Sequence, residues 1–439
     1  MAMESIPQLL IGAVSSGSGK TTLSLGLMRL LHRRGLRVQP YKCGPDYIDT
    51  QFHRVAAGRP SVNLDLFFAG GPRLRNTYSH WAQGADAVVV EGAMGLFDGA
   101  VRAEGSAAQV AQVLGLPVIV VLNAEAMAYT AAPLLYGLKH FAEGLEVVGV
   151  VFNQVKTKSH YQFLQDAAAD VGLCALGYLP PAPALGIPSR HLGLNTDTLA
   201  QQTQYAEQVA DFVEQHIDVA QLLYITKRSR PIEPSSKLYA PSGRNLKIAL
   251  AHDEAFNFMY EENLELLKTL GEVVFFSPLR AQALPPCDLL YLPGGYPELH
   301  LEALSGNTEM LAAVRRWVET GGRTWGECGG MMYLSTSIES QEGHVYPMVG
   351  VLPQLCSMRQ PKLKLGYRQF CYHGLQLRGH EFHYSHSTTA LPSEAQVYSA
   401  RGQAVDAQLL RYKNTLASYV HLYWPSAEAL LRLFEQEEL

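Results

Sequence analysis

Short apolar runs alternate with amphipathic segments along the first half of the chain. These runs are residues 9–14, 87–90, 117–122 and 147–152. A helix is predicted after the first run, because leucines recur there at helical spacing and Gly35 follows as a C-cap; the leucines are Leu23, Leu27, Leu30 and Leu31. Strands that are apolar on both faces and alternate with helices predict a parallel sheet covered on both sides. Ligands are then expected at the carboxyl ends of the strands.

A polar stretch interrupts this pattern at residues 227–236, where prolines and charges replace the apolar periodicity. A second strand–helix series follows, with apolar runs at 246–251, 272–276 and 288–292. We therefore predict an α/β chain of two domains, a P-loop parallel-sheet domain over 1–226 and a second α/β domain over 245–439. Residues 227–244 are predicted to link them.

Composition supports two ordinary globular domains and narrows the class of protein. The 439 residues are 47% hydrophobic and 17% charged, and the net charge of −5 argues against a nucleic-acid-binding protein. The apolar runs are too short to span a bilayer, and the N-terminus lacks a signal-like pattern, so we expect a cytoplasmic protein without membrane partners. Six cysteines without a CxxC pair predict neither a disulfide framework nor a zinc site.

The segment 13–22, AVSSGSGKTT, has the pattern of a phosphate-binding loop between a strand and a helix. Glycines let backbone N–H groups converge on phosphates, the lysine reaches the outer phosphates, and the first threonine places its hydroxyl on Mg²⁺. A strict motif has Gly at position 14, where this chain has Val14. The residues expected to contact a nucleotide are Gly17, Gly19, Lys20, Thr21 and Thr22.

Acidic residues follow two later apolar segments and are candidates for metal or substrate binding. Glu91, at the end of the run 87–90, is the first choice for Mg²⁺, and Asp98 is the second. In the loop 41–50, Lys42 is expected to neutralise phosphate or a carboxylate, and Asp46 and Asp49 to bind metal or steer an amine. An ordinary turn with solvated aspartates is the alternative. Asn153 either reads an adenine edge or caps a turn.

The second half contains G-x-C-x-G around Cys328, the pattern of a nucleophile elbow with sulfur as the nucleophile. The following helix N-terminus is expected to favour the thiolate, and His421 is the candidate base. Backbone N–H groups of Gly294, Gly295 and Gly329 are expected to stabilise an oxyanion or bind glutamine. A buried structural cysteine is the alternative. A thiol hydrolase joined to an ATP site suggests that one half releases ammonia from glutamine while the other activates a carboxylate.

Taken in order, these segments resemble the cobyrinic acid a,c-diamide synthase family of cobalamin biosynthesis over nearly the whole chain. The segments that carry the resemblance are 15–22, 42–50, 91–99, 190–194, 326–330, 379–385 and His421. The resemblance implies a dethiobiotin-synthetase-like ATPase domain followed by a class I glutamine amidotransferase domain. It also implies that ATP phosphorylates the a and c carboxylates of cobyrinic acid, and that ammonia released from glutamine attacks each acyl phosphate.

The same resemblance implies roles for individual residues. Lys20, Thr21, Asp46 and Glu91 would serve ATP and Mg²⁺, and Tyr47 and Asp49 would lie near the substrate carboxylate. Arg190 would help to grip the macrocycle. Cys328 would be the nucleophile and His421 its activating base.

One departure from triad amidotransferases is clear: Leu422 and Tyr423 follow His421 where the usual motif has Pro-Glu, so the residue that orients His421 is unassigned. Hydrogenobyrinic acid and nickel sirohydrochlorin are alternative substrates. A partitioning-type switch ATPase is the rival of a different class, but it gives Cys328 no role. The sequence leaves a homodimer open.

Overall fold

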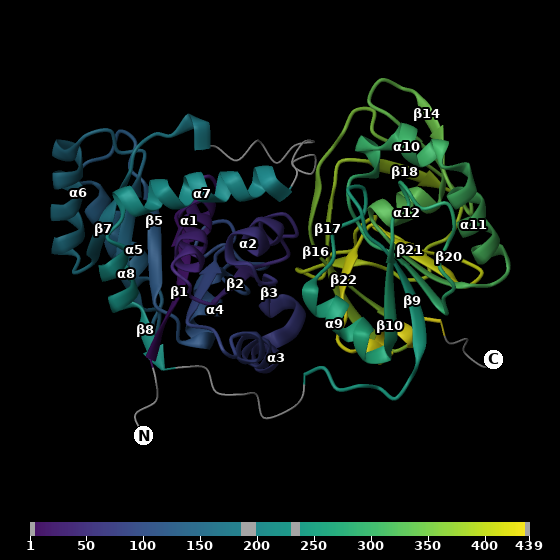
Figure 1. The fold of residues 1–439 in the computed structure, drawn as a ribbon, viewed down its shortest axis with the longest axis horizontal. Coiled ribbons are helices and arrows are strands. Elements are labelled where there is room, and N and C mark those ends of the chain that lie inside the picture. The colour runs from purple at the N-terminus through teal and green to yellow at the C-terminus, as the bar shows by residue number, and fades with distance from the viewer. Residues whose placement is uncertain (1–4, 186–198, 230–237, 435–439) are drawn as a thin grey trace. The chain divides into compact units, whose positions relative to one another are not determined.

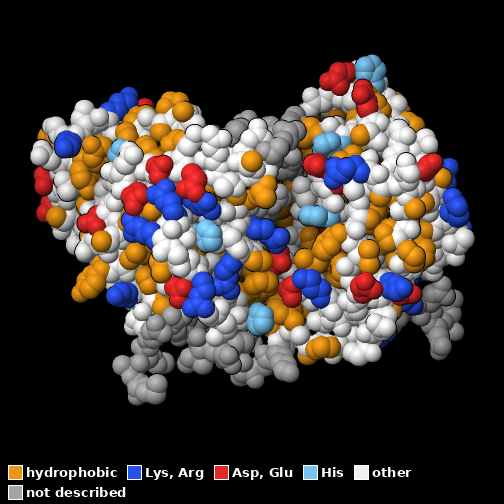
Figure 2. All heavy atoms as spheres, viewed as in Figure 1, with side chains coloured by type: hydrophobic (Ala, Val, Ile, Leu, Met, Phe, Trp, Pro, Cys, Tyr) orange, Lys and Arg blue, Asp and Glu red, His pale blue; other side chains and the backbone are white. Residues whose placement is uncertain are grey.

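The computed structural model describes residues 5–185, 199–229 and 238–434. The chain divides into two compact units, Met1–Leu238 and Tyr239–Leu439 (Figure 1). None of the described helices is both long and apolar enough to traverse a bilayer. On the face drawn in Figure 2, Lys and Arg side chains are interspersed with Asp and Glu side chains.

The first unit is built on one sheet whose strands run in the order β3-β2-β4-β1-β5-β6-β7, all parallel. A further strand, β8, pairs antiparallel with the beginning of β1. The bounds are β1 Ser5–Ala13, β2 Val38–Cys43, β3 Val62–Leu64, β4 Ala87–Glu91, β5 Val118–Asn123, β6 Val147–Asn153, β7 Cys174–Leu179 and β8 Lys227–Ser229.

Helices cover both faces of this sheet, and each face has its own apolar core. Helices α3, α4, α5 and α6 contribute to one core, and α1, α2, α7 and α8 to the other. The bounds are α1 Lys20–Arg33, α2 Asp49–Ala57, α3 Leu66–Trp81, α4 Ala107–Leu114, α5 Ala131–His140, α6 Lys158–Asp170, α7 Leu199–His216 and α8 Val219–Ile225, with a 3₁₀ turn at Pro183–Leu185.

The predicted apolar runs correspond to β1, β4, β5 and β6, and the predicted parallel sheet is confirmed. Two details differ from the sequence analysis. Strand β1 ends at Ala13, and Val14 is 43% exposed because it already belongs to the loop. The predicted linker is also wrong at its start, since Lys227–Ser229 form β8 of the first unit's sheet.

The second unit has a central sheet with the strand order β10-β9-β11-β12-β21-β20, parallel except for β20. Two smaller sheets, β14-β13-β15-β18 and β19-β16-β17-β22, complete it. The strand bounds are β9 Leu246–Ala251, β10 Gly271–Phe276, β11 Leu289–Leu292, β12 Arg323–Glu327, β13 Ser335–Glu339, β14 Val345–Pro347, β15 Leu352–Ser357, β16 Lys364–Tyr372, β17 Leu375–His383, β18 His386–Thr389, β19 Tyr398–Ser399, β20 Leu409–Tyr412, β21 Thr415–Ser418 and β22 His421–Tyr423.

Two apolar cores again lie on opposite sides of the central sheet. Helices α10, α11 and α12 contribute to one core together with β13 and β15, and helices α9 and α13 to the other together with β16, β17 and β22. The helix bounds are α9 Glu261–Leu270, α10 Leu301–Gly306, α11 Thr308–Glu319, α12 Gly329–Leu334 and α13 Ala427–Arg432, with a 3₁₀ turn at Pro297–Leu299. The turn from β12 into α12 therefore lies at the carboxyl edge of a parallel sheet, where active sites of open α/β folds form.

Candidate active sites

The first candidate site is the loop between β1 and α1. Its glycines adopt left-handed backbone angles, with φ of 76° at Gly17 and 105° at Gly19. The Nζ of Lys20 donates to the carbonyl oxygens of Ser15, at 3.1 Å, and of Met94. The Lys20 side chain therefore lies across its own loop, where its ammonium group is close to the expected phosphate site. Thr21 and Thr22 follow in the first turn of α1.

Asn153 braces this loop from the end of β6. Its Nδ2 donates to the carbonyl oxygen of Ser18 at 2.9 Å, and its Oδ1 accepts from the backbone N–H of Gln154. A side chain at Gly19 would place its Cβ 2.4 Å from Nδ2 of Asn153. Of the two roles that the sequence allows for Asn153, the geometry favours holding the turn.

A buried charged cluster lies beside the loop and centres on Glu91. One carboxylate oxygen, Oε1, accepts from the Thr21 hydroxyl at 2.8 Å and from Lys42 Nζ at 2.7 Å. The other, Oε2, lies 2.8 Å from Nε2 of His53. Asp49 completes the cluster through an ion pair with Lys42 at 2.7 Å. Lys42, Asp49, His53 and Glu91 are all at most 2% exposed.

The charges of this cluster stabilise one another. Burial disfavours the charged forms of both Glu91 and Lys42. The Lys42 ammonium and His53 outweigh burial at Glu91 and hold the pKa of its carboxyl group well below the ordinary value. In the same way, Asp49, Glu91 and Asp46 outweigh burial and raise the pKa of Lys42 above its ordinary value. The ammonium and the carboxylate are therefore both ionised at neutral pH. Sequence reasoning missed His53, which stands only four residues after Asp49 on α2.

The remaining predicted residues of the first site lie in the loop 41–50, in the turn 95–98 or outside the described residues. The Asp46 carboxylate accepts from the backbone N–H groups of Ile48 and Asp49, both at 2.9 Å, and so caps the beginning of α2. Tyr47 is buried. Asp98 is exposed and accepts from the N–H of Gly95, which fixes its own turn. Arg190 lies outside the described residues.

The residues present fit a Mg²⁺-bound nucleotide better than a metal held by protein alone. Among the residues that the structure describes, no group of three or more His, Cys, Asp or Glu side chains is arranged to hold a metal ion. Mg²⁺ commonly takes one or two protein oxygens together with phosphates and waters. The Thr21 hydroxyl and the Glu91 carboxylate supply two such oxygens next to a phosphate loop.

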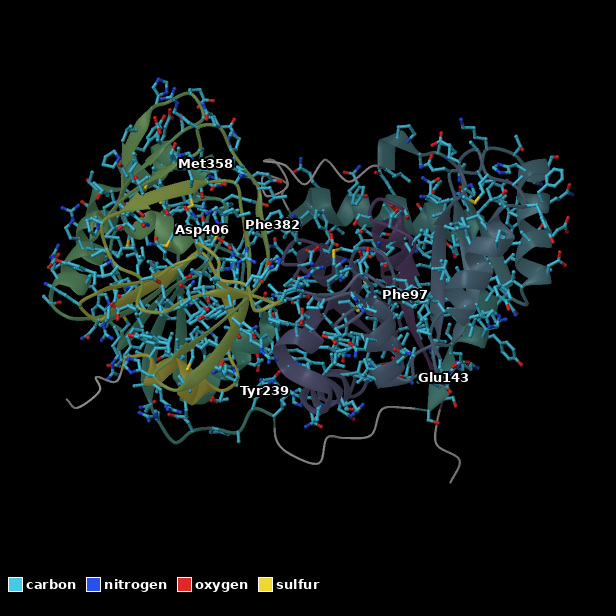
Figure 3. The ribbon with its side chains drawn as sticks, turned by 180° about the vertical axis from the view of Figure 1, so that it is seen from behind. Phe97, Glu143, Tyr239, Met358, Phe382 and Asp406 are labelled. Atoms are coloured by element: carbon cyan, nitrogen blue, oxygen red, sulfur yellow. The ribbon has the colours of Figure 1, made fainter. Side chains whose placement is uncertain are left out.

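The second candidate site is the turn from β12 into α12. Cys328 occupies it with φ 45° and ψ −104°, a conformation that is strained for a residue other than glycine. Its N–H donates to the carbonyl oxygen of Ser418 at 2.7 Å, and its Sγ lies 3.9 Å from the carbonyl oxygen of Phe382 on β17. Phe382 is labelled in Figure 3. The turn at Cys328 has the backbone geometry of a nucleophile elbow.

The N–H of Gly329 at the helix N-terminus lowers the pKa of the Cys328 thiol, as expected, but this effect is outweighed in the free protein. Burial and the charges of Glu298, Glu381 and Glu327 raise the thiol pKa well above its ordinary value, and the N–H of Gly329 offsets only part of this. Because Cys328 is only 4% exposed, the penalty for an unsolvated charge dominates. The thiol therefore needs a base that removes its proton during the reaction.

His421 on β22 is the candidate base and packs against the glycine loop. Burial, together with His380 and His383, lowers the pKa of His421 to about 3, so the imidazole is neutral in the free protein and one ring nitrogen lacks a proton. A side chain at Gly294 would place its Cβ 2.0 Å from Cε1 of His421. At Gly329 a Cβ would lie 3.1 Å from the backbone N of Gly295. The three predicted glycines are thus brought together beside the base and the elbow.

A row of polar groups on β16 and β17 lies near the thiol, and its members were not assigned roles from the sequence. Arg368 Nε donates to Glu381 Oε2 at 2.6 Å, and Glu381 Oε1 lies 2.8 Å from His383 Nε2. The His383 ring stacks on Tyr419 with 3.7 Å between centroids. Burial opposes ionisation of Glu381, but His383 and Arg368 outweigh it and lower its pKa. The available signal was the group of titratable residues His380, Glu381 and His383 within the segment 379–385.

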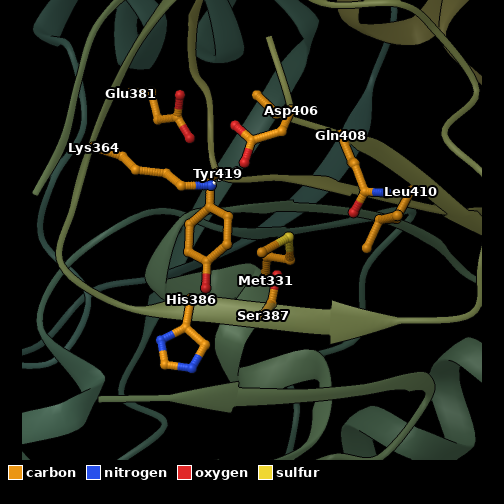
Figure 4. A pocket seen from close by; sticks show the side chains of 10 residues that line it. Met331, Lys364, Glu381, His386, Ser387, Asp406, Gln408, Leu410 and Tyr419 are labelled. Atoms are coloured by element: carbon orange, nitrogen blue, oxygen red, sulfur yellow. Dashed lines mark hydrogen bonds and ion pairs between the residues drawn. The ribbon is translucent and has the colours of Figure 1, made fainter. Parts of the chain in front are cut away.

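A cavity of about 200 Å³ adjoins these polar groups (Figure 4). Residues that line it include Met331, Lys364, Glu381, His386, Asp406 and Tyr419. Lys364 and Asp406 form an ion pair at 2.7 Å in its wall. Cys328 does not line the cavity, but Met331 belongs to the helix that begins directly after Cys328.

Comparison with known proteins identifies both units. Residues 9–194 match the CobQ/CobB/MinD/ParA nucleotide binding domain, and residues 247–429 match the CobB/CobQ-like glutamine amidotransferase domain. A cobyrinate a,c-diamide synthase of Salmonella typhimurium is 37% identical over 450 aligned residues, covering 96% of each chain. One of Picrophilus torridus is 38% identical, also over 96% of each chain. A hydrogenobyrinate a,c-diamide synthase of Pseudomonas aeruginosa is 38% identical over 97% of this chain and 96% of its own.

The resemblance inferred from the motifs is confirmed by these matches, and so is the class of enzyme, a glutamine-hydrolysing carbon–nitrogen ligase. A nucleotide-binding domain and a glutamine amidotransferase domain follow each other in the predicted order. The chain belongs to the family of cobyrinate and hydrogenobyrinate a,c-diamide synthases.

Proposed function

We propose that the chain uses ATP and glutamine to amidate the a and c carboxylates of cobyrinic acid in the cytoplasm. The observation that carries the proposal is the presence of two different centres in one chain. A phosphate loop with a buried Lys42–Glu91 pair suits carboxylate activation. A strained Cys328 and a neutral His421, which both adjoin the glycine loop 294–295, suit glutamine hydrolysis.

In the first centre, the residues bind and orient the reactants. Backbone N–H groups of the loop 14–19 would hold the ATP phosphates. The Lys20 ammonium would then donate hydrogen bonds to phosphate oxygens instead of to the carbonyl oxygens of Ser15 and Met94. Thr21 and Glu91 would hold Mg²⁺, which when bound neutralises phosphate charge. A substrate carboxylate is already ionised at neutral pH, so its attack on the γ-phosphorus needs no protein base.

The acyl phosphate formed in this way is the electrophile for amide formation. The carboxylate oxygen bonds to phosphorus while the bond to ADP breaks. Ammonia then attacks the acyl carbon, and inorganic phosphate leaves with its bonding electrons. Lys42 is placed to stabilise negative charge at this end of the sheet, because its ammonium stays protonated between Asp49 and Glu91.

In the second centre, Cys328 would attack the side-chain amide carbon of glutamine. His421 would take the thiol proton and give it to the departing ammonia. N–H groups of Gly295 and Gly329 would stabilise the oxyanion. Water then hydrolyses the thioester, releasing glutamate and restoring the thiol.

Hydrogenobyrinic acid is a second candidate substrate, because relatives named for it are as similar to this chain as those named for cobyrinic acid. The test incubates the protein with ATP, glutamine and each macrocycle in turn, including nickel sirohydrochlorin, and separates mono- and diamides by chromatography. Formation of the a,c-diamide of cobyrinic acid is expected. Failure to amidate cobyrinic acid would refute the proposed substrate.

The variant Cys328→Ala tests the division of labour. It should abolish synthesis with glutamine and retain synthesis with ammonium salts. Unchanged synthesis with glutamine would refute the role of Cys328. ATP turnover without any amide product would instead favour a switch ATPase.

A further inference from the structure

The carboxylate of Glu327 lies between the strand that carries the nucleophile and the strand that carries the base. Glu327 is the last residue of β12, directly before Cys328, and is only 2% exposed. Its Oε1 accepts from Nε1 of Trp325 at 2.8 Å and from the backbone N–H of Leu422 at 3.1 Å. Because Leu422 follows His421 on β22, this carboxylate joins the elbow to the strand of the base.

The second oxygen of Glu327 is directed at the base itself. Oε2 lies 3.9 Å from Nδ1 of His421, an ion-pair distance that is longer than a hydrogen bond. Catalytic hydrogen bonds are often long in the free enzyme and shorten when substrate binds. In the usual triad a carboxylate two residues after the histidine faces this nitrogen, and here that position is Tyr423. The hydroxyl of Tyr423 instead donates to Glu262.

We propose that Glu327 is the positioning residue that orients His421 and completes the glutaminase centre from the position directly before the nucleophile. The inference rests on the proposed glutaminase function of Cys328 and His421. Glu327 accepts the Nδ1–H of His421, which leaves Nε2 unprotonated to take the Cys328 proton. The imidazolium formed is then stabilised by the adjacent carboxylate.

The electrostatics of the pair give this arrangement a pH signature. Burial raises the pKa of Glu327 to about 8, although Trp325, Leu422 and Tyr291 stabilise its charge. On the other side, His380 and His383 of β17 face His421 and disfavour its protonation. The carboxylate that can accept from Nδ1–H is therefore populated increasingly as the pH rises toward 8. Glutaminase kcat/KM should rise over the same interval.

The test is the variant Glu327→Gln, which keeps an oxygen for Trp325 and Leu422 and presents an amide N–H₂ to His421. This forces the imidazole into the wrong tautomer for a base. We expect glutamine-dependent kcat to fall about 10²–10⁴-fold, with ammonia-dependent synthesis and Tm nearly unchanged. The alkaline rise in kcat/KM should also disappear. Glu262→Gln is the matched control, because Glu262 is equally buried and contacts β22 through Tyr423; its glutaminase activity should stay within a few-fold of wild type.

A second measurement, made on the wild-type protein, does not depend on how Glu327→Gln folds. In wild-type protein labelled with ¹⁵N-histidine, the signal lost in His421→Ala identifies the imidazole of His421. Above pH 8 this ring should carry its proton on Nδ1. A ring protonated on Nε2 instead would overturn the proposal.

Two kinetic outcomes would also overturn it. Glutaminase activity of Glu327→Gln within threefold of wild type would show that the carboxylate does not orient the base. An equal loss of glutamine- and ammonia-dependent synthesis with a lowered Tm would show a purely structural role. Failure of the proposed function is distinguishable, since Cys328→Ala would then leave glutamine-dependent synthesis intact.

Discussion

Gly294 offers a sharp test of how closely the glycine loop fits the base. In Gly294→Ala the new Cβ would lie 2.0 Å from Cε1 of His421, whereas ordinary contacts begin at 3.4 Å. Relieving the clash therefore requires a shift of about 1.4 Å between the loop and the imidazole. A misplacement of about 1 Å at a reacting group costs about 10²-fold in rate. Overpacking a buried site costs about 1–3 kcal/mol of stability.

We expect glutamine-dependent synthesis to fall about 10²-fold while ammonia-dependent synthesis is retained. The assay measures amide formation with each nitrogen donor, together with thermal unfolding. Gly306→Ala is the control, because a Cβ there meets nothing within 4 Å, and both activities should be unchanged. Full glutaminase activity in Gly294→Ala would refute the close packing of the loop against His421.

Three further predictions follow from described contacts. Gly19→Ala forces alanine to φ 105° and toward Asn153, so ATP binding measured by calorimetry should weaken at least about tenfold; unchanged affinity would contradict the loop geometry. Lys42→Met leaves Glu91 and Asp49 buried without their cation. The free energy of unfolding in urea should fall by about 3–5 kcal/mol, and amide synthesis should be lost with either nitrogen donor. Stability equal to that of the wild type would argue against the buried pair. Burial raises the pKa of Glu327 to about 8 in the folded state, against an ordinary value of 4.5. The stability that its protonated form confers is therefore complete below pH 4.5 and is lost as the pH rises to 8. The loss amounts to at most about 1.4 kcal/mol per pH unit. Urea titrations at pH 5 and 7.5 should show this decline in wild type and less of it in Glu327→Gln.

The sequence predicted those parts of the fold that depend on apolar patterning and on glycine motifs. Strands β1, β4, β5 and β6 each contain an unbroken apolar run, and the two strand-to-helix turns carry glycines at fixed spacing. Strand β2 was not predicted, because Gln39 and Lys42 interrupt its apolar pattern although both are buried. Lys42 is tolerated there only through partners that lie seven and 49 residues away in the chain.

Roles that depend on distant pairs could not be predicted from spacing. Glu327 is visible in the G-E-C motif, but its proximity to His421 depends on β22 reaching β12 from 94 positions further along the chain. His53 likewise gains its meaning only from Glu91 on another strand. The raised pKa of the Cys328 thiol reflects burial first and then the charges of Glu298, Glu381 and its neighbour Glu327. Burial and the approach of Glu298 and Glu381 depend on the fold and could not be predicted from the local sequence.

Strand β8 has a practical consequence for dissecting the protein. Its residues Lys227–Ser229 pair with Ser5–Pro7, and Gln8 Nε2 donates to the carbonyl oxygens of Arg228 and Ser229. A fragment that ends at residue 226 would lack β8 and so leave the beginning of β1, the strand that leads into the phosphate loop, without this partner. The unpaired backbone groups of β1 would then favour self-association of the fragment. A nucleotide-binding fragment should therefore extend to residue 238, and its solubility relative to the shorter fragment would report how much the loop depends on a strand more than 200 residues away.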